Sequence, residues 1–193
     1  MVAQTRISYM HDLLTEVRQL PPQQADALIA AHADDWARLE KDYGGAWVDQ
    51  DVFFPMFETL RRELGDDDFR ELFRRLSGRL VKAPFLQALV ESVIRISGLR
   101  PHTLLKVAPK ARQGLVKNYG VLRYHRVGVD HAELRMTDAP ASCWSTGTTA
   151  LLLVGSMEGL IDLCNQEPIV SLTEFDGQAG SGVIDARWAE KGG

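Results

Sequence analysis

The C-terminal half of the chain alternates between hydrophobic and polar residues in short runs. In HAELRMTD (131–138), Ala132, Leu134 and Met136 alternate with polar neighbours, and this period of two predicts a strand with one buried face. Three further runs have strand character: YGVLRYHR (119–126), IVSLTEF (169–175) and GVIDARW (182–188). Short links rich in turn-forming residues join the first pair of runs and the last pair. The pattern therefore predicts two antiparallel hairpins.

Between the hairpins lies the most apolar part of the chain, SCWSTGTTALLLVGSMEGLIDLC (142–164). It does not predict a membrane span, because only about nine apolar residues precede Glu158 whereas a bilayer needs about 20. We predict instead a central helix over 143–164. Gly155 and Gly159 share one face of that helix, and we expect this face to pack closely on the sheet.

The N-terminal half shows the spacing of amphipathic helices. Ile7, Met10 and Leu14 recur at helical intervals, and later helices are predicted from about Pro22 to Tyr43, over 53–64, after Gly65, over 85–96 and over 103–118. The whole predicts an α+β fold, in which an N-terminal helical bundle precedes a hairpin–helix–hairpin that forms a four-stranded antiparallel sheet. We interpret 1–193 as a single domain with a helical extension (1–44), a helical part (45–118) and a sheet part (119–193).

Composition places few limits on function. The chain has 193 residues, 45% of them hydrophobic, and a net charge of −4, which is ordinary for a globular protein. Charged residues within the first 20 positions do not fit a signal peptide, and two cysteines do not indicate a disulfide scaffold. We therefore expect a cytoplasmic protein. No P-loop, GxGxxG, HExxH or GxSxG motif is present, so we expect no enzyme.

The order of elements, together with the segment APKARQGLVKNYGVLRYHRVGVDHAELRM (108–136), resembles a known superfamily. Its branches are the vinyl-4-reductase-type domains of bacterial sensors, the heme nitric oxide/oxygen-binding domains and the TRAPP vesicle-transport subunits. The segment looks most like a paralogous myxobacterial family of unknown function, and the likeness covers about 54–188. It implies a regulatory or sensory role, and a ligand space between the helices and the sheet.

The resemblance also implies two cofactors that the sequence does not match. A zinc site of the vinyl-4-reductase type would use Cys143 and Glu174, but the final hairpin has no cysteine and stable zinc needs about four ligands. Heme-binding relatives carry an axial histidine on the helix before the first hairpin and a tyrosine–serine–arginine clamp after it. Here His102 stands at the start of that helix, His125 lies in the next strand, and the clamp is absent. We expect no cofactor.

Two further features have a functional and a structural interpretation. Cys143, at the head of the central helix, could be an activated thiol, but we favour a small buried residue. The stretch 99–129 is rich in Lys and Arg and has no Asp or Glu before Asp130. It predicts either a surface for an acidic partner or intramolecular charge balance, and its candidate partner-binding residues are Lys106, Lys110, Arg112, Lys117 and Arg123. The overall acidity argues against nucleic-acid binding.

The leading hypothesis is a non-enzymatic regulatory or sensory domain that binds a small apolar ligand or a protein partner and forms a homodimer. The candidate pocket residues are Trp47, Phe53, Phe57, Phe73, Cys143 and Trp144. Three further hypotheses remain open: an interaction scaffold like the TRAPP subunits without ligand, a heme- or zinc-binding sensor, and an enzyme that uses the Cys143 thiol.

Overall fold

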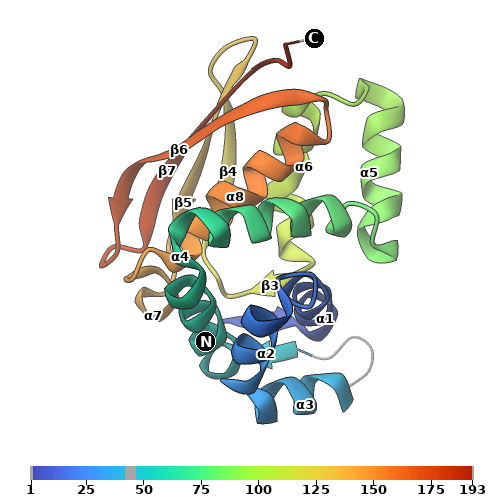
Figure 1. The fold of residues 1–193 in the computed structure, drawn as a ribbon. Helices are drawn as coiled ribbons and strands as arrows, with labels where there is room; N and C mark the ends of the chain where they lie inside the picture. The colour runs from blue at the N-terminus through green and yellow to red at the C-terminus, as the bar shows by residue number, and fades with distance from the viewer. Residues whose placement is uncertain (1, 42–46, 193) are drawn as a thin grey trace.

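A computed structural model describes residues 2–41 and 47–192 (Figure 1). Its helices are α1 (Ile7–Val17), α2 (Pro22–Ala30), α3 (Ala33–Lys41), α4 (Gln50–Leu80), α5 (Pro84–Ser97), α6 (Pro101–Gln113), α7 (Ala141–Trp144) and α8 (Thr148–Asp162). Its strands are β1 (Gln4–Arg6), β2 (Trp47–Asp49), β3 (Val116–Lys117), β4 (Val121–Arg126), β5 (His131–Thr137), β6 (Gln166–Asp176) and β7 (Ser181–Glu190). The predicted boundary at Gly44-Gly45 lies outside the described residues.

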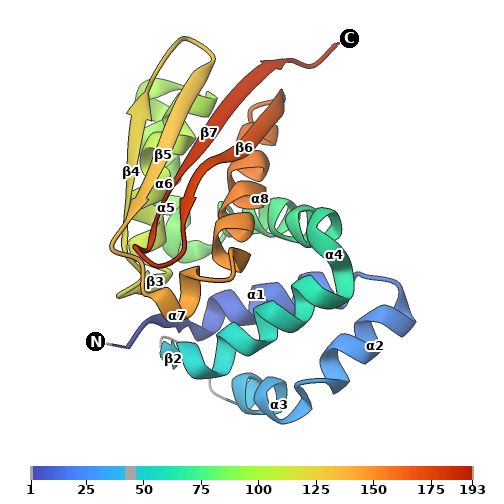
Figure 2. The same cartoon turned by 90° about the vertical axis from the view of Figure 1, so that its left-hand side faces the viewer.

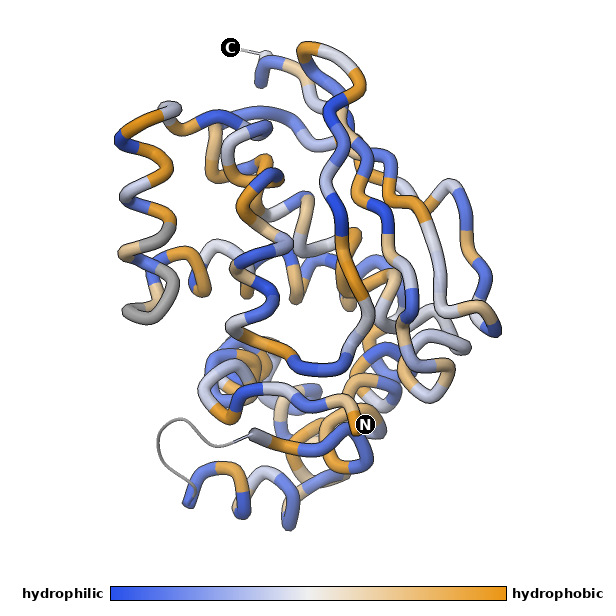
Figure 3. Tube along the Cα trace, turned by 180° about the vertical axis from the view of Figure 1, so that it is seen from behind, coloured by the Kyte–Doolittle hydropathy of each residue, from blue (hydrophilic) through white to orange (hydrophobic). Residues whose placement is uncertain are grey.

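The two predicted hairpins form one antiparallel sheet of four strands in the order β4-β5-β7-β6. Leu134 of β5 lies opposite Ile184 of β7, and both side chains are buried, as the alternating pattern requires. Figure 3 shows this alternation along β5. Helix α8 packs against β6 and β7, and α6 packs against β4 (Figure 2). The predicted α+β fold and its four-stranded sheet are confirmed.

Helix α4 connects the two ends of the molecule. Figure 1 shows α1, α2 and α3 on one side of it and the sheet with α5 and α6 on the other. Gly65 has a φ of 76° and kinks α4, which confirms the predicted break there, because this conformation suits glycine. No helix of the described ranges, α4 with its 31 residues included, is long and apolar enough to cross a bilayer.

Three elements differ from the sequence prediction. The single helix expected after Pro22 is divided into α2 and α3. Helix α6 ends at Gln113 rather than near Asn118, and the chain then forms strand β3. A second, three-stranded sheet in the order β2-β1-β3 was not predicted. Its strands have only two or three residues each, too few to show a periodic pattern.

The predicted central helix over 143–164 is two helices, and its glycines face a different neighbour. Gly147, in the left-handed region with φ 76°, separates the short α7 from α8. A Cβ added at Gly155 would overlap the carbonyl oxygen of Arg70 in α4, and one added at Gly159 would overlap that of Arg74. The expected packing of these glycines on the sheet is therefore wrong, because they bring α8 against α4.

Candidate functional site

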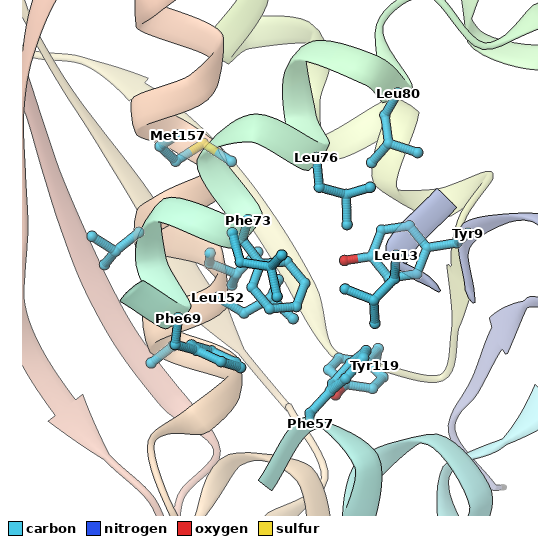
Figure 4. Close-up of a cluster of buried hydrophobic side chains, with 14 of the residues drawn as sticks. Tyr9, Leu13, Phe57, Phe69, Phe73, Leu76, Leu80, Tyr119, Leu152 and Met157 are labelled. Atoms are coloured by element: carbon cyan, nitrogen blue, oxygen red, sulfur yellow. The ribbon is translucent and has the colours of Figure 1, made fainter. Parts of the chain in front are cut away.

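An apolar cavity lies among helices α1, α4, α5, α6 and α8. Its volume is about 130 Å³, several times the space that a single water needs. Figure 4 shows Tyr9, Phe57, Leu80, Tyr119 and Met157 around the space. The remaining lining is mostly aliphatic, so the cavity suits an apolar occupant better than a string of waters.

Two tyrosines, Tyr9 and Tyr119, bring phenol hydroxyls to the lining of the cavity. The Tyr119 hydroxyl lies 3.0 Å from the hydroxyl oxygen of Thr149, whereas the Tyr9 hydroxyl has no hydrogen-bond partner among the described residues. Burial raises the pKa of both Tyr9 and Tyr119 well above that of a free phenol. Both hydroxyls are therefore protonated at neutral pH; Tyr119 donates its hydrogen to Thr149, whose own hydroxyl donates to the Cys143 carbonyl, and the Tyr9 hydroxyl is left as a donor for a ligand.

The structure separates the predicted pocket residues into two groups. Phe53 and Phe57 line the cavity, and Phe73 lies behind Phe57 with ring centroids 5.7 Å apart. Trp47 does not line the cavity. The Lys117 ammonium lies 3.9 Å from the centroid of the Trp47 ring. Trp144, like Cys143, is fully buried away from the cavity. A role of these residues in ligand binding stays a prediction.

Cys143 lies in an environment that does not activate a thiol. Its sulfur donates a hydrogen bond to the Gln50 side-chain oxygen at 3.0 Å. Burial raises the pKa of the Cys143 thiol, although hydrogen bonds from Ser142 and Tyr119 act in the opposite direction. Since the thiolate is the nucleophile, this geometry favours the structural interpretation. Cys143 and Cys164 are both free thiols, and within the described residues no group of His, Cys, Asp and Glu has a metal-binding arrangement.

His102 lies on the face of α6 that points away from the cavity. Its Nε2 donates to the Gly128 carbonyl at 2.8 Å, and its Nδ1 accepts from the Tyr124 hydroxyl at 2.6 Å. The imidazole also packs edge-on against the Trp188 ring at 4.7 Å. The helix positions that reach the cavity are Leu104, Val107, Ala108, Ala111 and Arg112. Both ring nitrogens of His102 are thus occupied by structural hydrogen bonds.

Most, but not all, of the basic residues predicted to bind a partner are exposed. Lys106, Lys110, Lys117 and Arg123 are exposed. Arg112 is half-buried and lines the cavity, so its role at a partner-binding surface stays a prediction. The sequence showed Arg112 as one more basic residue of a basic stretch. Only the register of α6 shows that it shares the cavity face with Ala108 and Ala111.

Comparison with known proteins gives a structural relationship without a sequence family. No family model matches the chain, and no curated protein matches it. Among solved structures, a mutant of the T. tengcongensis H-NOX domain superimposes with a TM-score of 0.62 at 15% identity and covers 96% of this chain and 97% of its own.

Two further H-NOX structures agree with this match. An oxygen-binding H-NOX domain related to soluble guanylate cyclases has a TM-score of 0.60 at 14% identity and covers 96% of this chain and 94% of its own. The Fe(II) unliganded H-NOX protein from K. algicida has a TM-score of 0.59 at 9% identity and covers 96% and 97%. At this identity the matches establish similarity of fold alone: the chain has an H-NOX-like fold.

Proposed function

We propose that this chain is a non-enzymatic regulatory or sensory domain that binds an apolar molecule between its helices. The observation that carries the proposal is the cavity of about 130 Å³ with its mostly apolar lining. A natural core is packed with few voids larger than a water, so a cavity of this size costs stability unless a ligand fills it. The H-NOX-like fold supports a sensory role, because the similar structures include an oxygen-binding domain.

Filling the cavity is expected to abolish binding of a neutral apolar dye. Ala108 is 9% exposed and faces the cavity from α6, so a phenylalanine there occupies ligand space. We expect Ala108→Phe to weaken the binding of Nile red, measured by fluorescence titration, by about tenfold or more, since a bound apolar ring contributes roughly 1.5–3 kcal/mol.

Lys106→Phe is the matched control, because it places the same ring on an exposed position of the same helix. It should leave the affinity for Nile red within about twofold of the original. Circular dichroism checks that both variants are folded. Equal affinities in the original protein and Ala108→Phe, or no binding by the original protein, would contradict a ligand-binding cavity.

Heme is the second candidate ligand, and the fold comparison supports it because one of the similar H-NOX structures probes the function of heme distortion. The lining residues do not fit a histidine-ligated heme. The described residues around the cavity include no histidine, and His102 faces away from it. The protonated Tyr9 and Tyr119 are poor iron ligands, since a tyrosine binds iron as phenolate.

An absorbance spectrum distinguishes the two candidates. We expect the purified protein to show no Soret band, and added hemin to give only the broad spectrum of weakly associated heme, because the cavity supplies no imidazole. A sharp Soret band of a six- or five-coordinate heme in the purified protein would overturn the apolar-ligand proposal in favour of heme.

A role in binding a protein partner remains a separate proposal. Lys106 and Lys110 lie exposed on α6, and Arg123 is exposed on β4, so these cations are available to an acidic partner. Whether the chain forms a homodimer is likewise a prediction from the sequence.

A further inference from the structure

Arg112 places a positive charge in the wall of the otherwise apolar cavity. It occupies the last turn of α6, where one terminal nitrogen donates to the Tyr119 carbonyl at 2.7 Å and the other to the Gly120 carbonyl at 3.4 Å. The guanidinium carbon lies 5.3 Å from the centroid of the Tyr119 ring. Of the five N–H groups of an arginine, these two hydrogen bonds use two and leave three.

No carboxylate of the described residues neutralises Arg112. The ion pairs of this part of the chain join other arginines, such as Arg61, Arg70, Arg74 and Arg79, to acidic partners. Burial lowers the pKa of Arg112 to about 10, against a weaker opposing effect of Tyr119 and Tyr9, so the group is still charged at neutral pH. Arg112 is half-buried, and a partly desolvated charge without a counter-charge is unfavourable, so an anionic ligand group would reduce that cost.

Tyr9 supplies a second donor near this charge. It lines the same cavity from α1, and its hydroxyl has no hydrogen-bond partner among the described residues. Figure 4 shows that hydroxyl pointing toward the space between the helices. Arg112 and Tyr9 lie close enough for each to influence the ionisation of the other. Both line the same cavity, where Arg112 retains N–H donors and Tyr9 an O–H donor.

The described residues that line the cavity include no second charged group. Leu80, Val90, Leu104, Leu153 and Leu160 form its aliphatic wall. We propose that the ligand is an apolar carboxylic acid, whose carboxylate binds Arg112 and Tyr9 and whose hydrocarbon part lies against this wall. Arginine suits this role because its planar guanidinium can donate two parallel hydrogen bonds to the two oxygens of a carboxylate. The inference rests on the proposed function and gives its ligand a chemical class.

Competition between matched amphiphiles tests the inference. Dodecanoic acid and dodecan-1-ol have the same chain and differ in the charged head, and each is titrated against protein carrying Nile red. We expect dodecanoate to displace the dye at a concentration about tenfold or more below that of dodecanol, because a charge-assisted hydrogen bond to a desolvated arginine strongly favours the anion. In Arg112→Gln this preference is expected to disappear, while dodecanol displaces the dye as before.

Lys110→Gln is the matched control, since it removes the same charge from an exposed position two residues away and should retain the preference. Tyr9→Phe, which keeps every charge, is expected to reduce the preference severalfold and covers the case in which Arg112→Gln does not fold. Equal displacement by the acid and the alcohol in the original protein would overturn the carboxylate inference and leave the proposed cavity function standing. Absence of any Nile red binding would overturn both.

Discussion

Replacing Gly159 with alanine is expected to destabilise the protein by about 3 kcal/mol, near the upper end of the usual cost of overpacking. An added Cβ would overlap the Arg74 carbonyl oxygen of α4 and would lie 2.9 Å from the Ser77 Cβ. The carbonyl belongs to a helix backbone and cannot rotate away, so α4 and α8 must separate. Alanine favours the helix by about 1 kcal/mol over glycine, and the steric term exceeds this gain. Chemical denaturation measures the change in the free energy of unfolding.

Separation of the helices also strains the ion pairs beside the glycines. Glu158 pairs with Arg70, and Asp162 pairs with Arg74, so each arginine comes from the same α4 turn that touches a glycine of α8. The contact therefore combines close backbone approach with charge pairing across the same two helices. Partly exposed pairs contribute little alone, and we attribute most of the expected loss to the backbone overlap.

Gly78→Ala provides the matched control for Gly159→Ala. Gly78 lies in the same helix pair, on α4, but its added Cβ would meet nothing closer than a Leu163 methyl at 4.0 Å. Helix propensity alone then applies, and we expect a stabilisation of about 0.5–1 kcal/mol. If Gly159→Ala also stabilised the protein, α8 and α4 would not be in such close contact.

The sequence predicted the helices and strands better than it predicted which of them pack against each other. The hairpin strands were predictable because Ala132, Leu134 and Met136 alternate strictly, and the break in α4 was predictable because Gly65 interrupts a helical pattern. The glycine face of α8 indicated a close contact, but a pattern of small residues does not specify whether a sheet or a helix makes it. The sequence favoured the sheet, and the structure has α4.

The residues of the candidate site could likewise be predicted only in part from the sequence. Phe53 and Phe57 were predicted as pocket residues because apolar aromatic residues line most ligand sites, and this reasoning could not separate them from Trp144, which packs elsewhere. Arg112 was assigned to the surface because charged residues are rarely buried. Its inward position depends on the register of α6 against the cavity, which a single basic stretch does not reveal. Tyr9 and Leu104 gave no functional signal in the sequence, because each fits an ordinary amphipathic helix.

Trp144→Ala is expected to cost about 3–5 kcal/mol of stability without weakening the binding of Nile red. Trp144 is fully buried, its indole N–H donates to the Ser181 carbonyl at 3.0 Å, and its ring lies 5.8 Å from that of Phe175. Truncation leaves a cavity between α7 and the β6–β7 hairpin and removes the hydrogen-bond donor of a partly buried carbonyl, and deletions of this size cost about that much. Denaturation measures the loss, and titration of the variant under native conditions measures the dye affinity.

Phe57→Leu separates a structural role from a ligand-binding one. Phe57 is as buried as Trp144 but lines the cavity, so its replacement by a smaller side chain changes the surface that the ligand contacts. We expect this variant to lose only about 1–2 kcal/mol of stability but to bind Nile red with an affinity altered by about fivefold or more, whereas Trp144→Ala keeps its affinity within about twofold. Since a stable domain has roughly 5–15 kcal/mol to lose, circular dichroism checks that both variants are folded before titration. A folded Trp144→Ala variant whose dye affinity changed as much as that of Phe57→Leu would place Trp144 at the ligand, and the cavity among α1, α4, α5, α6 and α8 would then not be the whole site.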